Sequence, residues 1–171
     1  MFAREQFFAE LFISTGGGED MQSQFINNQI LGNIIYEQCI NAACIRHGLI
    51  KTEMDILLFL HNNPGFDTAT DIVKHRHLSK SHVSKSIQSL KERGYLTTFY
   101  KGTNRRTVHL TLTDAANPAI IDGLRAQERF SSILLADFTE EEKVQFQTYL
   151  CRIADNLRFH FQPDTGVSKE L

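Results

Sequence analysis

Two short stretches of this chain carry polar side chains that could do chemistry, and both contain cations. Residues 79–88 combine small hydroxyl side chains with two lysines and a glutamine, and residues 104–106 hold an asparagine and two arginines. Lysine and arginine bind phosphate, while short polar side chains let a helix backbone approach the edges of bases. The residue types predict a DNA-contacting surface made of Ser79, Lys80, Ser81, His82, Ser84, Lys85, Gln88, Asn104, Arg105 and Arg106.

The charge of the chain is unevenly distributed. Its net charge is −2, yet residues 74–106 contain nine lysines and arginines against one acidic residue, Glu92. That segment therefore has a net charge of +8, and the remainder of the chain has a net charge of −10. Such a division is expected if one face meets phosphate and the rest stays away from it. The alternative interpretation is an ordinary solvated run of charges.

A helix over residues 79–93 must position the first polar stretch. Ser79 is its expected N-cap, and a glycine follows its end. At about 100° per residue, Val83, Ile87 and Leu90 fall on one face and the polar residues fall on the opposite face. We expect the apolar face to anchor the helix in the core and the polar face to meet a partner. An ordinary solvated helix face is the alternative.

Helical spacing of apolar residues predicts three helices before that one. A long helix covers residues 21–47, and a nearly all-apolar helix begins after Thr52 and ends before Asn63. A short helix to about residue 75 opens with a capping box formed by Thr68 and Asp71. The apolar stripe of the long helix is wider than packing on one side requires, so we expect part of it to meet a second subunit.

The pattern changes period after residue 94. Residues 95–100 and 107–112 are rich in β-branched and aromatic side chains and predict two strands joined by a basic turn. A helix is expected after Thr113, and a capping box at residues 139–142 opens a last helix to about residue 161. The fold class is therefore mainly α with a small antiparallel β-hairpin wing, a winged helix-turn-helix.

Residues 52–113 resemble the multiple-antibiotic-resistance regulator (MarR) family. The segment LSKSHVSKSIQSLKERGYL at residues 78–96 resembles the family's recognition helix and its exit into the wing, and residues 104–106 and 110–114 match the wing and the helix after it. The resemblance extends over roughly residues 25–160. One departure lies at the wing tip, where Asn104 replaces the family's common Asp. We expect Asn104 to hydrogen-bond the Arg106 guanidinium without charge.

The resemblance implies an organisation and a function. Residues 21–50 and 114–161 would be dimerisation helices, residues 51–113 the DNA-binding lobe, residues 1–20 a flexible or helical arm, and residues 162–171 a disordered tail. A homodimer of this kind binds an inverted-repeat operator on double-stranded DNA, sequence-specifically. The family usually represses transcription and releases DNA when a small-molecule effector or a stress signal changes the shape of the dimer.

The effector is the least determined part of this interpretation. Tyr36, Arg46 and His47 could line a ligand pocket between the dimer helices and the DNA-binding lobe. Cys39 and Cys44 could bind the same effector or make the chain a cysteine-based redox-sensing repressor. Ordinary packing and solvation is the favoured alternative for each of these residues.

Several classes of function are excluded or disfavoured. A Gly-rich phosphate loop, a nucleophile elbow and meaningfully spaced paired carboxylates are all absent, so we expect no enzyme and no cofactor. The chain has no run of 18 apolar residues, and its three cysteines form no CxxC pair, which favours a cytoplasmic protein without a structural metal. His75 and His77 are a weak candidate for metal sensing. The rival function is a winged-helix module that binds a protein instead of DNA.

Overall fold

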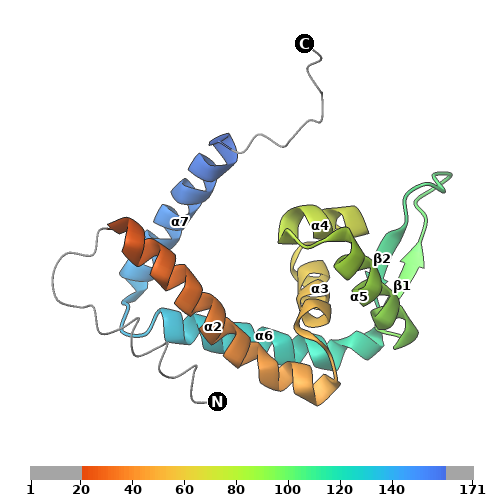
Figure 1. The fold of residues 1–171 in the computed structure, drawn as a ribbon, viewed down its shortest axis with the longest axis horizontal. Helices are drawn as coiled ribbons and strands as arrows, with labels where there is room; N and C mark the ends of the chain where they lie inside the picture. The colour runs from red at the N-terminus through yellow and green to blue at the C-terminus, as the bar shows by residue number, and fades with distance from the viewer. Residues whose placement is uncertain (1–20, 161–171) are drawn as a thin grey trace, which may run out of the picture. The chain divides into compact units, whose positions relative to one another are not determined.

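The computed structural model describes residues 21–160 (Figure 1), so the expected arm and tail, residues 1–20 and 162–171, lie outside the described residues. The chain divides into two compact units, Met1–Phe130 and Ser131–Leu171. The described elements of the first unit are α2 (Met21–His47), α3 (Lys51–Asn62), α4 (Ala69–Arg76), α5 (Lys80–Glu92), β1 (Leu96–Phe99), β2 (His109–Leu112), the 3-10 turn η1 (Asp114–Ala116) and most of α6 (Asn117–Leu134).

The two strands form one antiparallel sheet that projects as a hairpin beside α4 and α5 (Figure 1). Leu96 pairs with Leu112 at its base, and Phe99 pairs with His109 at the far end of the ladder. The strands are shorter than the sequence predicts, because pairing ends before the basic turn. The expected fold class, mainly α with a small antiparallel hairpin, is confirmed.

The start of α3 differs from the prediction. Thr52 was expected to cap this helix, but α3 begins at Lys51 and its N-cap is Ile50. The carboxylate of Glu53 accepts a hydrogen bond of 3.0 Å from the Ile50 backbone N–H. A side-chain acceptor three residues into the helix satisfies a backbone donor that the helix leaves unpaired, so no hydroxyl cap is needed.

Side-chain caps fix the start of α4 as the sequence predicts. Thr68 Oγ1 accepts from the Asp71 backbone N–H at 3.1 Å, and the Asp71 carboxylate accepts from the Thr68 N–H at 3.0 Å. The helix ends at Arg76, and its C-cap His77, with a φ of 50° in the left-handed region, turns the chain toward α5. At the start of α5, Ser79 Oγ accepts from the His82 N–H at 3.2 Å.

The core of the first unit lies between α2, α3, α4, α5 and α6, and Leu96 and Leu110 of the hairpin pack into it. On α5, Val83 and Leu90 are fully buried as expected, whereas Ile87 is only half-buried and Ser86, which the periodicity did not single out, is buried. The largest fully buried side chains are Ile40, Met54, Ile56, Leu57, Leu58, Ile72, Leu90 and Val83.

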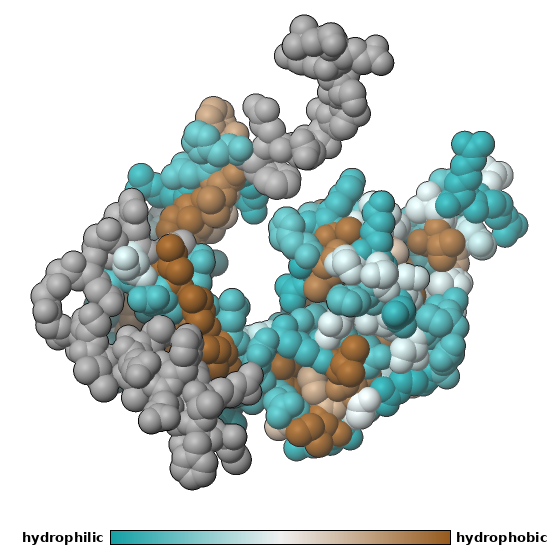
Figure 2. Space-filling model, viewed as in Figure 1, coloured by the Kyte–Doolittle hydropathy of each residue, from teal (hydrophilic) through white to brown (hydrophobic). Residues whose placement is uncertain are grey.

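The second unit contains the end of α6 and the helix α7 (Glu140–His160). The expected capping box opens α7, with Thr139 and Glu142 exchanging hydrogen bonds of 2.8 and 3.3 Å. Within Glu140–His160 no residue is buried, and apolar side chains gather on its surface (Figure 2). Its exposed apolar residues are Val144, Tyr149, Leu150, Ile153, Leu157 and Phe159.

Candidate nucleic-acid interface

One face of α5 is open to solvent and polar over its whole length. Every candidate DNA-contacting residue of this helix is exposed, whereas the opposite face is anchored in the core by Val83 and Leu90. Three members of this face pair locally, since Ser79 and Ser81 are joined through their hydroxyls at 3.1 Å and the Gln88 amide donates to Glu92 at 2.7 Å. The structure thus presents short polar side chains and two lysines on a helix whose position is set by the packing of its apolar face in the core.

The wing carries the remaining candidates on its exposed turn, where Figure 2 shows hydrophilic residues gathered at the tip. The two arginines differ. The Arg105 guanidinium lies 5.4 Å from the centre of the Tyr100 ring, close enough for a cation–π contact. The Arg106 guanidinium has no interaction partner within residues 21–160. Arg106 is therefore the wing cation more available to a partner.

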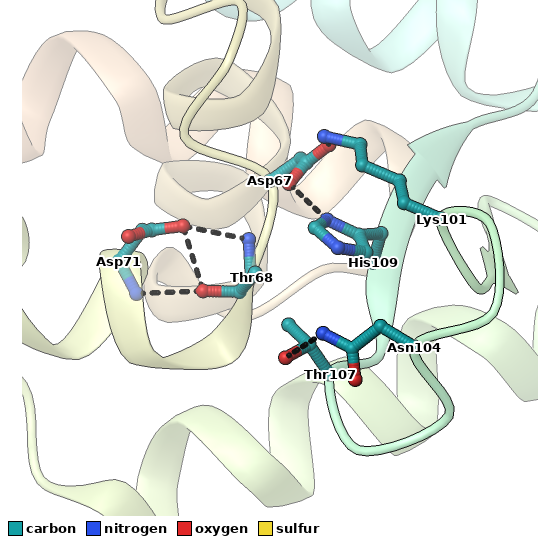
Figure 3. A network of polar contacts seen from close by, with 7 residues as sticks. All are labelled: Asp67, Thr68, Asp71, Lys101, Asn104, Thr107 and His109. Carbon is teal, nitrogen blue, oxygen red and sulfur yellow. Dashed lines mark hydrogen bonds and ion pairs between the residues drawn. The ribbon is translucent and has the colours of Figure 1, made fainter.

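Asn104 does not act on the arginine as expected. Its Oδ1 accepts from the backbone N–H of Arg106 at 2.9 Å. Its Nδ2 donates to Thr107 Oγ1 at 3.3 Å (Figure 3). The predicted contact with the Arg106 guanidinium is not made. An amide side chain favours this arrangement because it can accept and donate at once, which closes the turn on itself.

A groove of about 540 Å³ separates α4, α5 and the wing. Three of the predicted residues, Lys80, Ser84 and Gln88, line it, so the structure brings them together along one edge. Lys91 lines the same groove and was missed. Its position was available from helical spacing, because residues 80, 84, 88 and 91 follow one another at steps of four, four and three.

At the end of the strand ladder nearest the turn, Asp67 binds two side chains of the hairpin (Figure 3). Its carboxylate accepts from His109 Nδ1 at 2.6 Å and from Lys101 Nζ at 3.0 Å. Burial raises the pKa of Asp67, but hydrogen bonds from His109 and Lys101 outweigh it and leave the pKa below its ordinary value. Lys101, one of the basic residues of segment 74–106, thus has its charge paired within the protein.

Comparison with known proteins relates this arrangement to a family. Residues 47–99 match the model of the MarR family, whereas no curated protein matches the chain. A MarR transcriptional regulator from Methanosarcina mazei Go1 superposes with a TM-score of 0.67 at 19% identity, covering 81% of this chain and 99% of that one. The resemblance to the MarR family is confirmed.

Two further MarR structures match as well. MarR of Staphylococcus aureus, in complex with salicylate and kanamycin, has a TM-score of 0.67 at 16% identity, covering 82% of this chain and 95% of that one. A MarR family regulator from Listeria monocytogenes, complexed with 26mer DNA, has a TM-score of 0.63 at 16% identity, covering 82% and 90%. At these identities the likeness shows that this chain has the MarR fold.

The candidate effector residues of this MarR-like chain serve different contacts. Arg46 and His47 both bind the Asp122 carboxylate of α6, each at 2.8 Å. These hydrogen bonds, from His47 and then Arg46, hold the pKa of Asp122 below its ordinary value. Tyr36 donates to Asp55 at 3.4 Å and packs edge-on against Phe130. Burial raises the pKa of Tyr36.

The two candidate cysteines belong to the same helix, α2, but have different surroundings. Cys39 and Cys44 are buried free thiols. Of the five candidate effector residues, Cys44 alone lines a cavity of about 640 Å³ along α2. Burial, and then the nearby charge of Asp55, raise the pKa of the Cys44 thiol, which lowers the fraction of reactive thiolate.

The histidines considered for metal sensing do not form a site in the described part of the chain. Within residues 21–160 no three His, Cys, Asp or Glu side chains are grouped closely enough to hold a metal ion. The His75 ring packs 4.4 Å from that of Phe66. Among the same residues, no helix is both long and apolar enough to cross a membrane.

Proposed function

We propose that this chain is a sequence-specific DNA-binding transcriptional regulator, a repressor that binds an inverted-repeat operator as a homodimer. The exposed polar face of α5 carries the proposal, because it is anchored from behind by Val83 and Leu90 and flanked by a cationic wing. The α5 residues would read base edges and phosphates in the major groove, and Arg106 would enter the adjacent minor groove. The family match over residues 47–99 and the MarR fold support this function, since the superposed Methanosarcina protein is a MarR transcriptional regulator.

The exposed apolar side chains of the terminal helices support the homodimer. On α7, Leu150 and Leu157 are 47% and 66% exposed, and on α2, Ile26 and Ile30 are 56% and 48% exposed. Rows of exposed apolar side chains are costly in a monomer and are typical of subunit interfaces. A two-fold dimer would place its two α5 helices for half-sites about one DNA turn, roughly 34–36 Å, apart.

The proposal includes a small-molecule effector that controls DNA binding. It also places the protein in the cytoplasm. The MarR structure from S. aureus holds salicylate and kanamycin, which shows that this fold accommodates small molecules in that protein. The cavity along α2 is a candidate binding site in this chain. A redox switch at Cys44 is less well supported, because burial raises the pKa of its thiol.

The decisive experiment measures DNA affinity against salt concentration. Duplexes are first selected by the wild-type protein from a random library, and their affinity is then measured by fluorescence anisotropy. We expect log affinity to fall linearly with log salt, and Lys85→Ala to reduce that slope by about one if Lys85 meets a phosphate. Lys143→Ala is the matched control, because this α7 lysine already pairs with Glu140 at 2.7 Å.

The outcomes separate the two functions that the scaffold supports. If the affinity depends on salt but the slope is the same in Lys85→Ala, Lys85 does not contact a phosphate, and the regulator function still stands. Wild-type protein that selects no duplex, and binds mixed DNA without salt dependence, contradicts the proposal and favours a module that binds protein.

A further inference from the structure

Both oxygens of the Asp67 carboxylate are used to hold the wing. Oδ1 accepts from His109, which belongs to β2, and Oδ2 accepts from Lys101, which lies in the turn after β1 (Figure 3). A carboxylate can only accept here, so the Nδ1 of His109 carries the proton. One side chain from outside the hairpin therefore joins β2 to the turn that follows β1.

The backbone around Asp67 strengthens the same connection. The Leu110 N–H donates to the Asp67 carbonyl at 2.7 Å, and Thr68 forms a bridge with His109. Thr68 is also the N-cap of α4, held by Asp71. The start of β2 is thus attached to the start of α4, a helix whose own start is fixed by a capping box.

The outer part of the wing has little else to orient it. Leu96 and Leu110 are buried at its base, but every residue from 100 to 106 is exposed. The Phe99 ring lies 5.3 Å from that of His109 and 5.9 Å from Lys101 Nζ, and so covers one side of the ionic cluster. Partial cover reduces screening by water, which makes these charge-assisted hydrogen bonds stronger than fully exposed ones.

We propose that Asp67 is a positioning residue for DNA binding, one that touches no DNA itself. Through His109 and Lys101 it sets the direction of the wing and so aims Arg106 before DNA arrives. This inference rests on the proposed function. A wing ordered in advance loses less conformational freedom on binding, so the affinity gained through Arg106 depends on Asp67.

The same carboxylate determines which wing cation meets DNA. With its ammonium group 3.0 Å from Asp67, Lys101 is withdrawn from phosphate, while the Arg106 guanidinium has no partner within residues 21–160. The arrangement favours the planar arginine head over the lysine at this edge of the interface. A planar guanidinium suits the narrow minor groove better than an ammonium.

A double-mutant cycle tests the proposal on a duplex selected by the wild-type protein. Asp67→Asn keeps the shape of the side chain and removes its charge, and we expect it to weaken binding about fivefold. In the Arg106→Ala background the same change should have almost no effect, because the residue that Asp67 aims is gone. Asp155→Asn, an equal charge change on α7, is the matched control and should leave the affinity unchanged.

Two other outcomes overturn the proposal. If Asp67 merely masks Lys101, Asp67→Asn will tighten binding and steepen the salt dependence by about one unit. If Asp67 acts only on overall stability, the losses of DNA-binding free energy caused by Asp67→Asn and by Arg106→Ala will add in the double variant. Should Asp67→Asn fail to fold at the assay temperature, His109→Phe tests the same step, since it keeps a ring against Phe99 and removes the donor.

Tryptic cleavage of the free protein gives a readout that needs no DNA. Cleavage after Arg105 and Arg106 should become several times faster in Asp67→Asn, a larger increase than any change in the unfolding midpoint of the whole protein accounts for. Equal cleavage rates contradict the proposed role. A wild-type protein that binds no duplex refutes the proposed function and, with it, the DNA role of Asp67, whereas normal binding by Asp67→Asn refutes this inference alone.

Discussion

The helix α5 and the wing face the same groove, yet they are held in different ways. Helix α5 is fixed by apolar side chains, with Val83 and Leu90 fully buried. The wing has buried leucines at its base alone, and beyond them the Asp67 carboxylate holds it through Lys101 and His109. Apolar packing resists many small perturbations, while a polar cluster can be undone by one change of charge. The helix is therefore the fixed part of the interface, and the wing is the part that can be tuned.

Leu90→Ala should have the largest effect of any change that tests this contrast. Removing a fully buried leucine from α5 is expected to lower the free energy of unfolding by about 2–5 kcal/mol, through lost burial and the cavity left behind. Val108→Ala is the wing counterpart, because Val108 is 43% exposed, and it should change the free energy by about 0.5 kcal/mol or less. Urea unfolding of both variants measures the difference, and equal losses would remove the distinction between the two regions.

Within the wing, the two arginines are expected to contribute unequally to DNA binding. Arg106→Ala should weaken binding to a selected duplex about tenfold, at the low end for an arginine that reads a groove. Arg105→Ala should weaken it less, because the Arg105 guanidinium already lies over the Tyr100 ring. Equilibrium titrations of both variants at one salt concentration decide the order. A larger loss in Arg105→Ala contradicts the assignment of Arg106 to the minor groove.

Acid should loosen the wing before it loosens α5, which is the smallest of the expected effects. The pKa of Asp67 is lowered in the folded protein, so its stabilising contribution is complete above the ordinary value of about 3.9 and is lost as pH falls through the lower folded value. Amide hydrogen exchange at pH 6 and pH 3 should show falling protection at Leu110, whose N–H bonds the Asp67 carbonyl. Protection at Leu90 should fall less. A parallel fall at both amides indicates global unfolding instead.

Local signals in the sequence predicted much of this fold, because they depend on neighbours along the chain. The capping box of Thr68 and Asp71, the cap at Ser79 and the change of period after residue 94 all involve contacts within a few residues. The predicted start of α3 was wrong, although it too rested on a signal between neighbouring residues. The hydroxyl of Thr52 suggested a cap there, but the buried carboxylate of Glu53 accepts the hydrogen bond from the Ile50 backbone N–H instead.

Most candidate interface residues could likewise be predicted from helical periodicity, since a helix with one buried face must expose the other. Lys91 was missed although it lies on the same stripe. The partners of Asn104 were not predictable, because the choice between the arginine head and the backbone depends on the shape of the turn.

The sequence by itself determined the order of elements, the apolar face that anchors α5 and the position of the cations, all of which follow from short-range spacing. Tertiary structure alone decided which of those cations remain available. Asp67 and His109 are 42 positions apart, and Arg46 and Asp122 are 76 apart. Such pairings depend on how the whole chain packs, and no local period encodes them.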